Sequence, residues 1–246
     1  MRARGFAMSL LMLCSVQLIF AEDDPRRNPL RLKLESTYDE TVLSKYDTDK
    51  GSLNIYGANP FFHFDARKIG PGTLVVEVTF GMLKVRKMTY LVDGGGKTSD
   101  LDIAEVSLES DEKAVQLKAR LPGTWVQTVG GGDQASTMKA GESANKHLSK
   151  LIEKYGKATA SKKMGPNGLT LAEVMKWKVG EGFLEIEVSV GAGIVDKITY
   201  LIGNEREAKS TRMKVNNVDL TKGEMTIVIP GHSDRQSLGK ETGGKK

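Results

Sequence analysis

The stretch Lys68–Val92, KIGPGTLVVEVTFGMLKVRKMTYLV, decides the fold, because Lys178–Ile202, KVGEGFLEIEVSVGAGIVDKITYLI, repeats it at an offset of 110 residues. The two stretches share glycines, apolar residues and charged residues at matched positions. The identical pairs are Lys68/Lys178, Gly70/Gly180, Gly72/Gly182, Leu74/Leu184, Glu77/Glu187, Val78/Val188, Gly81/Gly191, Val85/Val195, Lys87/Lys197, Thr89/Thr199, Tyr90/Tyr200 and Leu91/Leu201. A repeat of this length predicts architecture before it predicts function.

Apolar and polar residues alternate within each stretch, which is typical of antiparallel strands with one buried and one solvated face. The residues expected on the buried faces are Leu74, Val76, Val78 and Phe80 in the first copy and Leu184, Ile186, Val188 and Val190 in the second. Short strands are also expected before each stretch, at residues 61–64 and 174–177, and near residues 106–108 and 218–220 after it.

A helix is expected ahead of each set of strands. In residues 35–46, Tyr38, Val42, Leu43 and Tyr46 lie near one helical face. In residues 144–155 an apolar stripe follows the candidate cap Ser143, and Gly156 is a stop signal. The expected fold class is therefore α+β, with two tandem repeats that each pack a helical segment on a roughly four-stranded antiparallel sheet.

Glycine-rich and polar stretches divide the chain into segments. The expected segments are a signal peptide at 1–21, a flexible leader at 22–34 that ends in a short strand at 30–34, a first repeat at 35–126, a Gly/Ser-rich linker at 127–142, a second repeat at 143–231 and a disordered tail at 232–246.

The first residues have the layout of a secretory signal: Arg2 and Arg4, an apolar run from Phe6 to Phe20, and then Ala21 before an acidic group. Cleavage after Ala21 predicts a secreted or periplasmic protein with no permanent membrane span; the alternative is an uncleaved anchor. The only cysteine, Cys14, lies inside this segment. It follows Leu13, which is a poor lipoprotein signal, so the expected mature chain has no disulfide and no thiolate chemistry.

The formal net charge is +5, and removal of Arg2 and Arg4 lowers it to +3. Such a mild, spread excess differs from the clustered basic stripe of a nucleic-acid-binding protein. Nucleic acid is therefore not an expected partner.

No constellation typical of catalysis or of a cofactor is present, and no metal site is predicted. The histidines His63, His147 and His232 lack partners at ligand spacing. Residues 47–51, DTDKG, resemble the start of a calcium loop but lack its later donors, so a capped helix end is the preferred interpretation. The glycine runs at 94–96 and 130–132 are interpreted as flexible loops rather than phosphate loops.

One polar feature recurs, on the solvated faces of the predicted sheets. The candidate binding residues are Glu77, Lys87, Thr89, Glu187, Lys197 and Thr199. Cross-strand charge pairing within each hairpin also explains them.

A family resemblance rests on Lys154–Gly156, Trp177 and the hairpin that ends in Ile198–Tyr200. This pattern resembles the SmpA/BamE-type module of the bacterial envelope, and its doubling is similar in layout to the β-lactamase inhibitor proteins. The resemblance implies a non-catalytic protein. It departs from the inhibitors, which have disulfides, and from the envelope lipoproteins, which have a properly placed lipidated cysteine.

The expected function is an exported, non-catalytic protein-binding or envelope-assembly module that uses the polar faces of two sheets, with another envelope or secreted protein as partner. The alternative is an exported hydrolase or small-ligand binder with a site between the repeats, for which His63, Asp65 and Trp177 are the first residues to test. A purely structural spacer is a third possibility.

Overall fold

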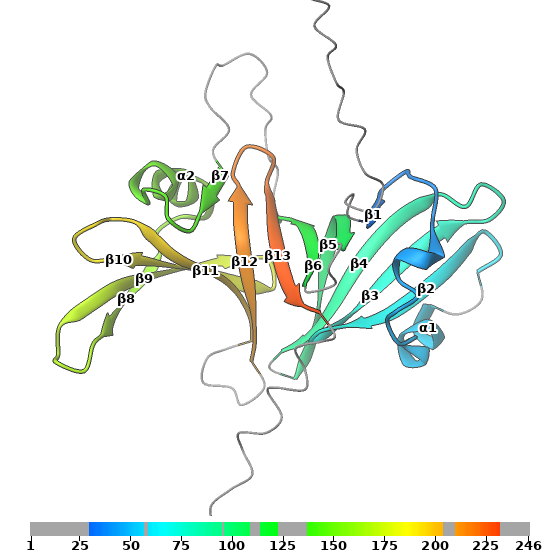
Figure 1. The fold of residues 1–246 in the computed structure, drawn as a ribbon, viewed down its shortest axis with the longest axis horizontal. Coiled ribbons are helices and arrows are strands. Elements are labelled where there is room, and N and C mark those ends of the chain that lie inside the picture. Colours follow the sequence, from blue (N-terminus) through cyan, green and yellow to red (C-terminus); the bar gives the residue numbers. More distant parts are fainter. Residues whose placement is uncertain are drawn as a thin grey trace, which may run out of the picture.

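The structure is a computed structural model, which describes residues 30–56, 59–94, 96–108, 114–122, 137–203 and 210–231. Strands dominate it (Figure 1). The strands are β1 (Leu30–Lys33), β2 (Phe62–Ile69), β3 (Gly72–Thr79), β4 (Val85–Gly94), β5 (Lys97–Leu108), β6 (Ala114–Arg120), β7 (Thr137–Lys139), β8 (Thr159–Met164), β9 (Thr170–Val179), β10 (Gly182–Ser189), β11 (Val195–Ile202), β12 (Thr211–Asp219) and β13 (Glu224–Pro230). The helices are the 3-10 helix η1 (Glu40–Val42), α1 (Lys50–Tyr56) and α2 (Asn145–Tyr155).

All of these strands belong to one 13-stranded sheet in the order β2-β3-β4-β5-β6-β13-β12-β11-β10-β9-β8, with β1 paired to β5 and β7 to β12. The predicted α+β class is therefore wrong, and so is the prediction of two tandem units with a small sheet each. The two stretches of related sequence are instead parts of one continuous, mostly antiparallel β-structure. The antiparallel pairing inferred from the alternation is confirmed.

The centre of the sheet is the pair β6 and β13, where Leu117 lies opposite Ile227. These two residues are themselves separated by the 110-residue offset, so the strands meet about a local two-fold relation. Both side chains are completely buried. If the two halves formed separate sheets, β6 and β13 would be edge strands, each with a row of unpaired N–H and C=O groups.

The strands of matched sequence occupy matched places on the two sides of this centre. The hydroxyl of Tyr90 donates to the carbonyl of Ile69 at 2.6 Å, and that of Tyr200 donates to the carbonyl of Val179 at 2.8 Å. Both rings are fully buried. Each ring packs over the glycine that starts the neighbouring strand. A Cβ on Gly72, the first residue of β3, would lie 2.8 Å from the ring of Tyr90.

We call the two sides of the sheet the core face and the outer face. The core face carries the alternating apolar residues of both halves, which form one buried cluster, with β1, η1, β7 and α2 packed at this side. In Figure 1, α2 lies above the sheet at the left and α1 lies below it at the right. The predicted core residues are confirmed except Phe80 and Val190, which are 58% and 56% exposed because the strands end there in turns.

Of the two predicted helices, one is confirmed and one is wrong. The second is confirmed as α2, although Ser143 does not cap it and Ile152 is exposed. The first is wrong: residues 35–46 contain only η1, and the α-helix begins later, at Lys50. Val42 and Leu43 are nevertheless buried in the core, so the apolar positions were predicted correctly and their conformation was not.

The predicted signal peptide and the predicted tail lie outside the described residues, and so do residues 123–136, which include 127–136 of the predicted linker. The short strand expected at 30–34 is β1. Residues 137–139, which we expected in the linker, form β7. In the described part of the chain, no helix has both the length and the apolar character required to cross a membrane.

Candidate functional site

The structure places the six predicted site residues in two groups of three, one in each half of the sheet. Glu77 lies opposite Lys87 on β3 and β4, and Glu187 lies opposite Lys197 on β10 and β11. The threonines follow two positions along β4 and β11, where they are buried, whereas both lysines are exposed. The prediction therefore brought together the correct neighbours within each half but did not identify a single site.

The two glutamates are engaged in ion pairs with residues that the sequence pattern did not indicate. Arg86 Nε lies 3.5 Å from Glu77 Oε1. Lys163 Nζ lies 2.5 Å from Glu187 Oε1. Lys163 belongs to β8, a strand that the sequence analysis did not predict and whose sequence, TASKKM, lacks an apolar face. All six of its residues are exposed, so only the pairing with β9 reveals the strand.

The outer face of the second half holds a more developed arrangement, centred on Glu185 of β10. Its side chain is 6% exposed and lies between two cations: Arg212 Nη1 donates to Oε2 at 2.8 Å, and Lys176 Nζ lies 3.1 Å from Oε1. The contact to Oε1 is close enough for an ion pair but lacks the alignment of a hydrogen bond. A buried carboxylate needs such neighbours to remain charged.

Phe183 lies beside this carboxylate on the same face. The ammonium groups of Lys176 and Lys178 lie 4.7 and 4.8 Å from the centre of its ring, within cation–π range. The ring therefore attracts both ammonium groups to this part of the outer face.

We call this surface the basic face. It consists of Lys163, Lys176, Lys178, Phe183, Lys197, Arg212 and Lys214. Its carboxylates are largely covered, since the side chains of Glu185 and Glu187 are 6% and 19% exposed, whereas those of Lys163 and Arg212 are 55% and 48% exposed. Among the described residues of this face, positive charge is therefore more exposed to solvent than negative charge.

The matched surface of the first half lacks this arrangement of cations around a buried carboxylate. At the matched positions, Ala66, Thr73 and Val75 replace Lys176, Phe183 and Glu185, and the strand register places Asp100 where the second half has Arg212. Helix α1 lies against β2 on this part of the outer face, where Asp49 binds Thr73. The asymmetry singles out the second half as the candidate site.

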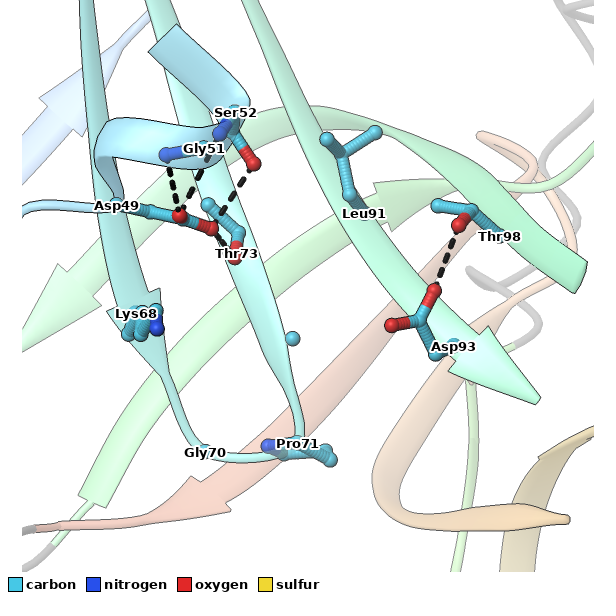
Figure 2. Close-up of a pocket in the computed structure, with 11 residues that line it drawn as sticks. Asp49, Gly51, Ser52, Lys68, Gly70, Pro71, Thr73, Leu91, Asp93 and Thr98 are labelled. Atoms are coloured by element: carbon cyan, nitrogen blue, oxygen red, sulfur yellow. Dashed lines mark hydrogen bonds between the residues drawn. The ribbon is translucent and has the colours of Figure 1, made fainter. Parts of the chain in front are cut away.

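A pocket of about 490 Å³ remains beside α1 (Figure 2). Figure 2 shows Asp49 with both carboxylate oxygens bonded: Oδ1 to the amides of Gly51 and Ser52, and Oδ2 to the hydroxyls of Ser52 and Thr73. Across the pocket, Asp93 accepts from Thr98 at 2.6 Å. The stretch that resembled a calcium loop therefore starts a helix, with Asp49 as its cap, instead of ending one.

Asp49→Ala is expected to lower the free energy of unfolding by about 1 kcal/mol, the typical worth of an N-cap. The hydrogen bond from Thr73 holds the pKa of Asp49 below its usual value. A depressed pKa means that the contribution is present above the unfolded pKa of about 4 and is lost as the pH falls. Urea unfolding of both proteins at neutral and acid pH checks this.

In that experiment the difference between wild type and variant should shrink toward acid pH. Asp47→Ala is the matched control, since Asp47 contributes its backbone carbonyl to Lys68 N. An equal loss of stability in both variants would contradict the capping role.

A second hollow of about 370 Å³ lies where the halves meet, lined by residues that include Asp102, Arg120, Glu181 and Tyr200. Its position between the halves is the one expected for a hydrolase or small-ligand site, but its lining does not include His63, Asp65 or Trp177. Burial raises the pKa of Tyr200 to about 12, so its hydroxyl stays neutral near pH 7. In the described part of the chain, no three His, Cys, Asp or Glu side chains gather as a metal site would require.

The structure does not bring together His63, Asp65 and Trp177. His63 is exposed on β2, while Trp177 is buried on β9, toward the other end of the strand order. Asp65 is 6% exposed and accepts hydrogen bonds from the hydroxyl of Tyr38 and from Arg67 Nε, the latter at 2.7 Å. Burial, followed by the bond to Asp65, raises the pKa of Tyr38. This cluster is fully engaged in fastening the segment before η1 to the sheet.

His147 and Gly94, which the sequence analysis also considered, have structural roles. His147 is buried, with Nε2 3.5 Å from Glu142 Oε2. Gly94 ends β4, and a Cβ there would lie 2.6 Å from the carbonyl oxygen of Ile202, so the glycine permits the two halves to touch. His232 and the glycines at 130–132 lie outside the described residues.

Comparison with known proteins finds no matching family model, no matching characterised protein and no matching solved structure. The resemblance to the SmpA/BamE-type module therefore stays a prediction.

Proposed function

We propose that this protein is an exported, non-catalytic binding protein whose basic face holds an acidic segment of another envelope or secreted protein. The observation that carries the proposal is the burial of Glu185 beneath Arg212 and Lys176, beside Phe183 and Lys178. A buried carboxylate of this kind orients two cations, and the aromatic ring positions a third.

The arrangement suits recognition better than stability. A pair buried on a sheet surface contributes little net stability, because desolvation offsets the attraction. Arg212 is 48% exposed, and the neighbouring Lys178 and Lys197 are exposed as well, whereas Lys176 is 21% exposed. Complementary charge of this kind gives specificity and fast association with an acidic partner.

The strand β8 adds a second means of binding. It is the last strand in the order, it pairs only with β9 among the described strands, and all of its residues are exposed. A free edge can accept an extended segment by backbone hydrogen bonds. Lys163 on this edge reaches the basic face, so an extended acidic segment placed along β8 would lie next to the cations.

Export rests on the signal-like residues 1–21. All residues of the buried cluster lie between Leu32 and Ile229, so a chain that starts at Glu22 keeps the whole core. This chain is the material for the experiments below.

The test measures binding of a fluorescent deca-glutamate peptide to the chain from Glu22 by anisotropy. The double variant Lys178→Glu/Lys197→Glu is expected to weaken binding about tenfold, which corresponds to about 1.4 kcal/mol. Both lysines are exposed, so folding should survive.

The matched control is Lys68→Glu/Lys87→Glu, the same two positions in the first half. It changes the net charge equally and should weaken binding less than about twofold, by general electrostatics alone. Equal losses in the two variants would overturn the assignment to the basic face. Retention of binding in both, or absence of binding to the wild type, would overturn the proposal itself.

A further inference from the structure

The turn between β3 and β4 carries large apolar side chains that the fold does not bury. Phe80, Met82 and Leu83 are 58%, 67% and 54% exposed. Phe61, which is 71% exposed, joins them because the amide of Phe80 donates to its carbonyl at 3.1 Å. We call these four residues the apolar tip. An exposed apolar group of this kind marks an interaction site or an aggregation hazard.

The backbone of the tip is strained to present one of these side chains. Leu83 has a φ of +48°, in the left-handed region that non-glycine residues rarely adopt. The matched residue in the turn between β10 and β11 is Gly193, with a φ of +63°. Both make the same bond to the start of the turn, to Thr79 and Ser189 respectively, at 3.1 Å.

The turn therefore requires a left-handed residue, and glycine satisfies this without steric cost. Leucine at the same place does not recover the cost through burial, since more than half of it faces solvent. Folding gives no reason for this leucine. Strain kept at a surface position points to a function for the side chain.

Basic residues follow the tip along the chain. Lys84, Arg86 and Lys87 are exposed on the turn and the first residues of β4. The guanidinium of Arg86 lies 4.7 Å from the ring centre of Phe62, and its Nε is 3.5 Å from Glu77, the one carboxylate of the described residues paired with it. Apolar side chains that lie next to cations are complementary to a layer with an anionic surface and an apolar interior.

We propose that the apolar tip inserts into the surface of a bilayer that contains anionic phospholipid. The tip lies at the end of the hairpin of β3 and β4, and all four of its side chains are more than half exposed, so it can enter a soft layer. Residues of the tip would reach the boundary of the acyl chains, while Lys84, Arg86 and Lys87 contact phosphate groups. Such binding is peripheral and reversible.

This inference is independent of the proposed function, because the tip and the basic face use different strands. The test is co-sedimentation of the chain from Glu22 with vesicles of phosphatidylcholine containing about one quarter phosphatidylglycerol, against vesicles of phosphatidylcholine alone. The wild type should bind the anionic vesicles and bind less at high salt, because screening weakens the contact with the cations.

Leu83→Gly is the decisive variant. It removes one inserted side chain and also relieves the strained backbone, so its melting temperature should equal or exceed that of the wild type while vesicle binding falls about tenfold. A loss of binding that came with a loss of stability would instead indicate damage to the fold. Phe80→Ser, which leaves the backbone unchanged, should lower binding in the same way.

Val190→Ser, the change at the position matched to Phe80, is the control and should leave vesicle binding within about twofold of the wild type. An equal loss in Val190→Ser would overturn the assignment to this tip. Unchanged binding in Leu83→Gly and Phe80→Ser, or failure of the wild type to bind, would overturn the inference. Deca-glutamate binding should be the same in all of these variants, which separates this result from the test of the basic face.

Discussion

Trp177→Ala is expected to lower the free energy of unfolding by about 3–5 kcal/mol, the usual cost of removing a large buried aromatic side chain. Trp177 is 1% exposed and lies opposite Leu184 in the sheet. Its indole Nε1 donates to the carbonyl of Gly156 at 3.1 Å, which holds the end of α2. The variant would lose this bond as well as the packing of the ring.

Urea unfolding followed by far-ultraviolet circular dichroism measures the change. Trp177→Phe is the companion variant: it keeps most of the ring and loses the hydrogen bond, for an expected loss of about 1–2 kcal/mol. If alanine and phenylalanine cost the same, the packing of the ring would not be the main contribution, and the place of α2 on the core face would need another explanation.

Leu117→Ala is expected to cost about 2–5 kcal/mol and to destabilise both halves of the sheet together. Leu117 is completely buried opposite Ile227 at the centre of the sheet, where β6 and β13 join the halves. Because the buried residues form one cluster, a single cooperative unfolding transition should shift to lower denaturant.

Calorimetry and circular dichroism should therefore report one transition in both the wild type and Leu117→Ala. Arg120→Ala on the same strand is the control, since its ion pair with Asp102 is exposed and worth at most about 1 kcal/mol. Two separate transitions, with only one of them shifted by Leu117→Ala, would mean that the halves fold independently and would contradict the continuous sheet.

Local periodicity was reliable where it concerned which side of a strand is buried. Leu184, Ile186 and Tyr200 follow from the alternation alone, and all are buried. The same reasoning failed for residues 35–46, because a helical spacing of apolar residues can also be met by an irregular segment. There Glu35 has a φ of +61° and donates its amide to the carbonyl of Val85 at 2.8 Å, so contacts with the start of β4 determine the backbone.

The candidate site was less accessible to sequence reasoning. Glu187 and Lys197 were found because they recur, yet the basic face depends on residues that do not recur, such as Lys176, Glu185 and Arg212. These three lie on β9, β10 and β12, and only the strand register brings them together. A comparison of the two copies for differences rather than identities would have pointed to them.

The amino-acid sequence by itself determined the strands of the two matched stretches, their buried sides and the places of the two matched tyrosines, since these depend on neighbours a few residues apart. It did not determine that the halves share one sheet. Alternation specifies that a strand has an apolar side, but either edge of β6 or β13 can pair with any compatible strand. Only the tertiary structure, in which burial of Leu117 and Ile227 and satisfaction of both edges occur together, decided that they pair with each other.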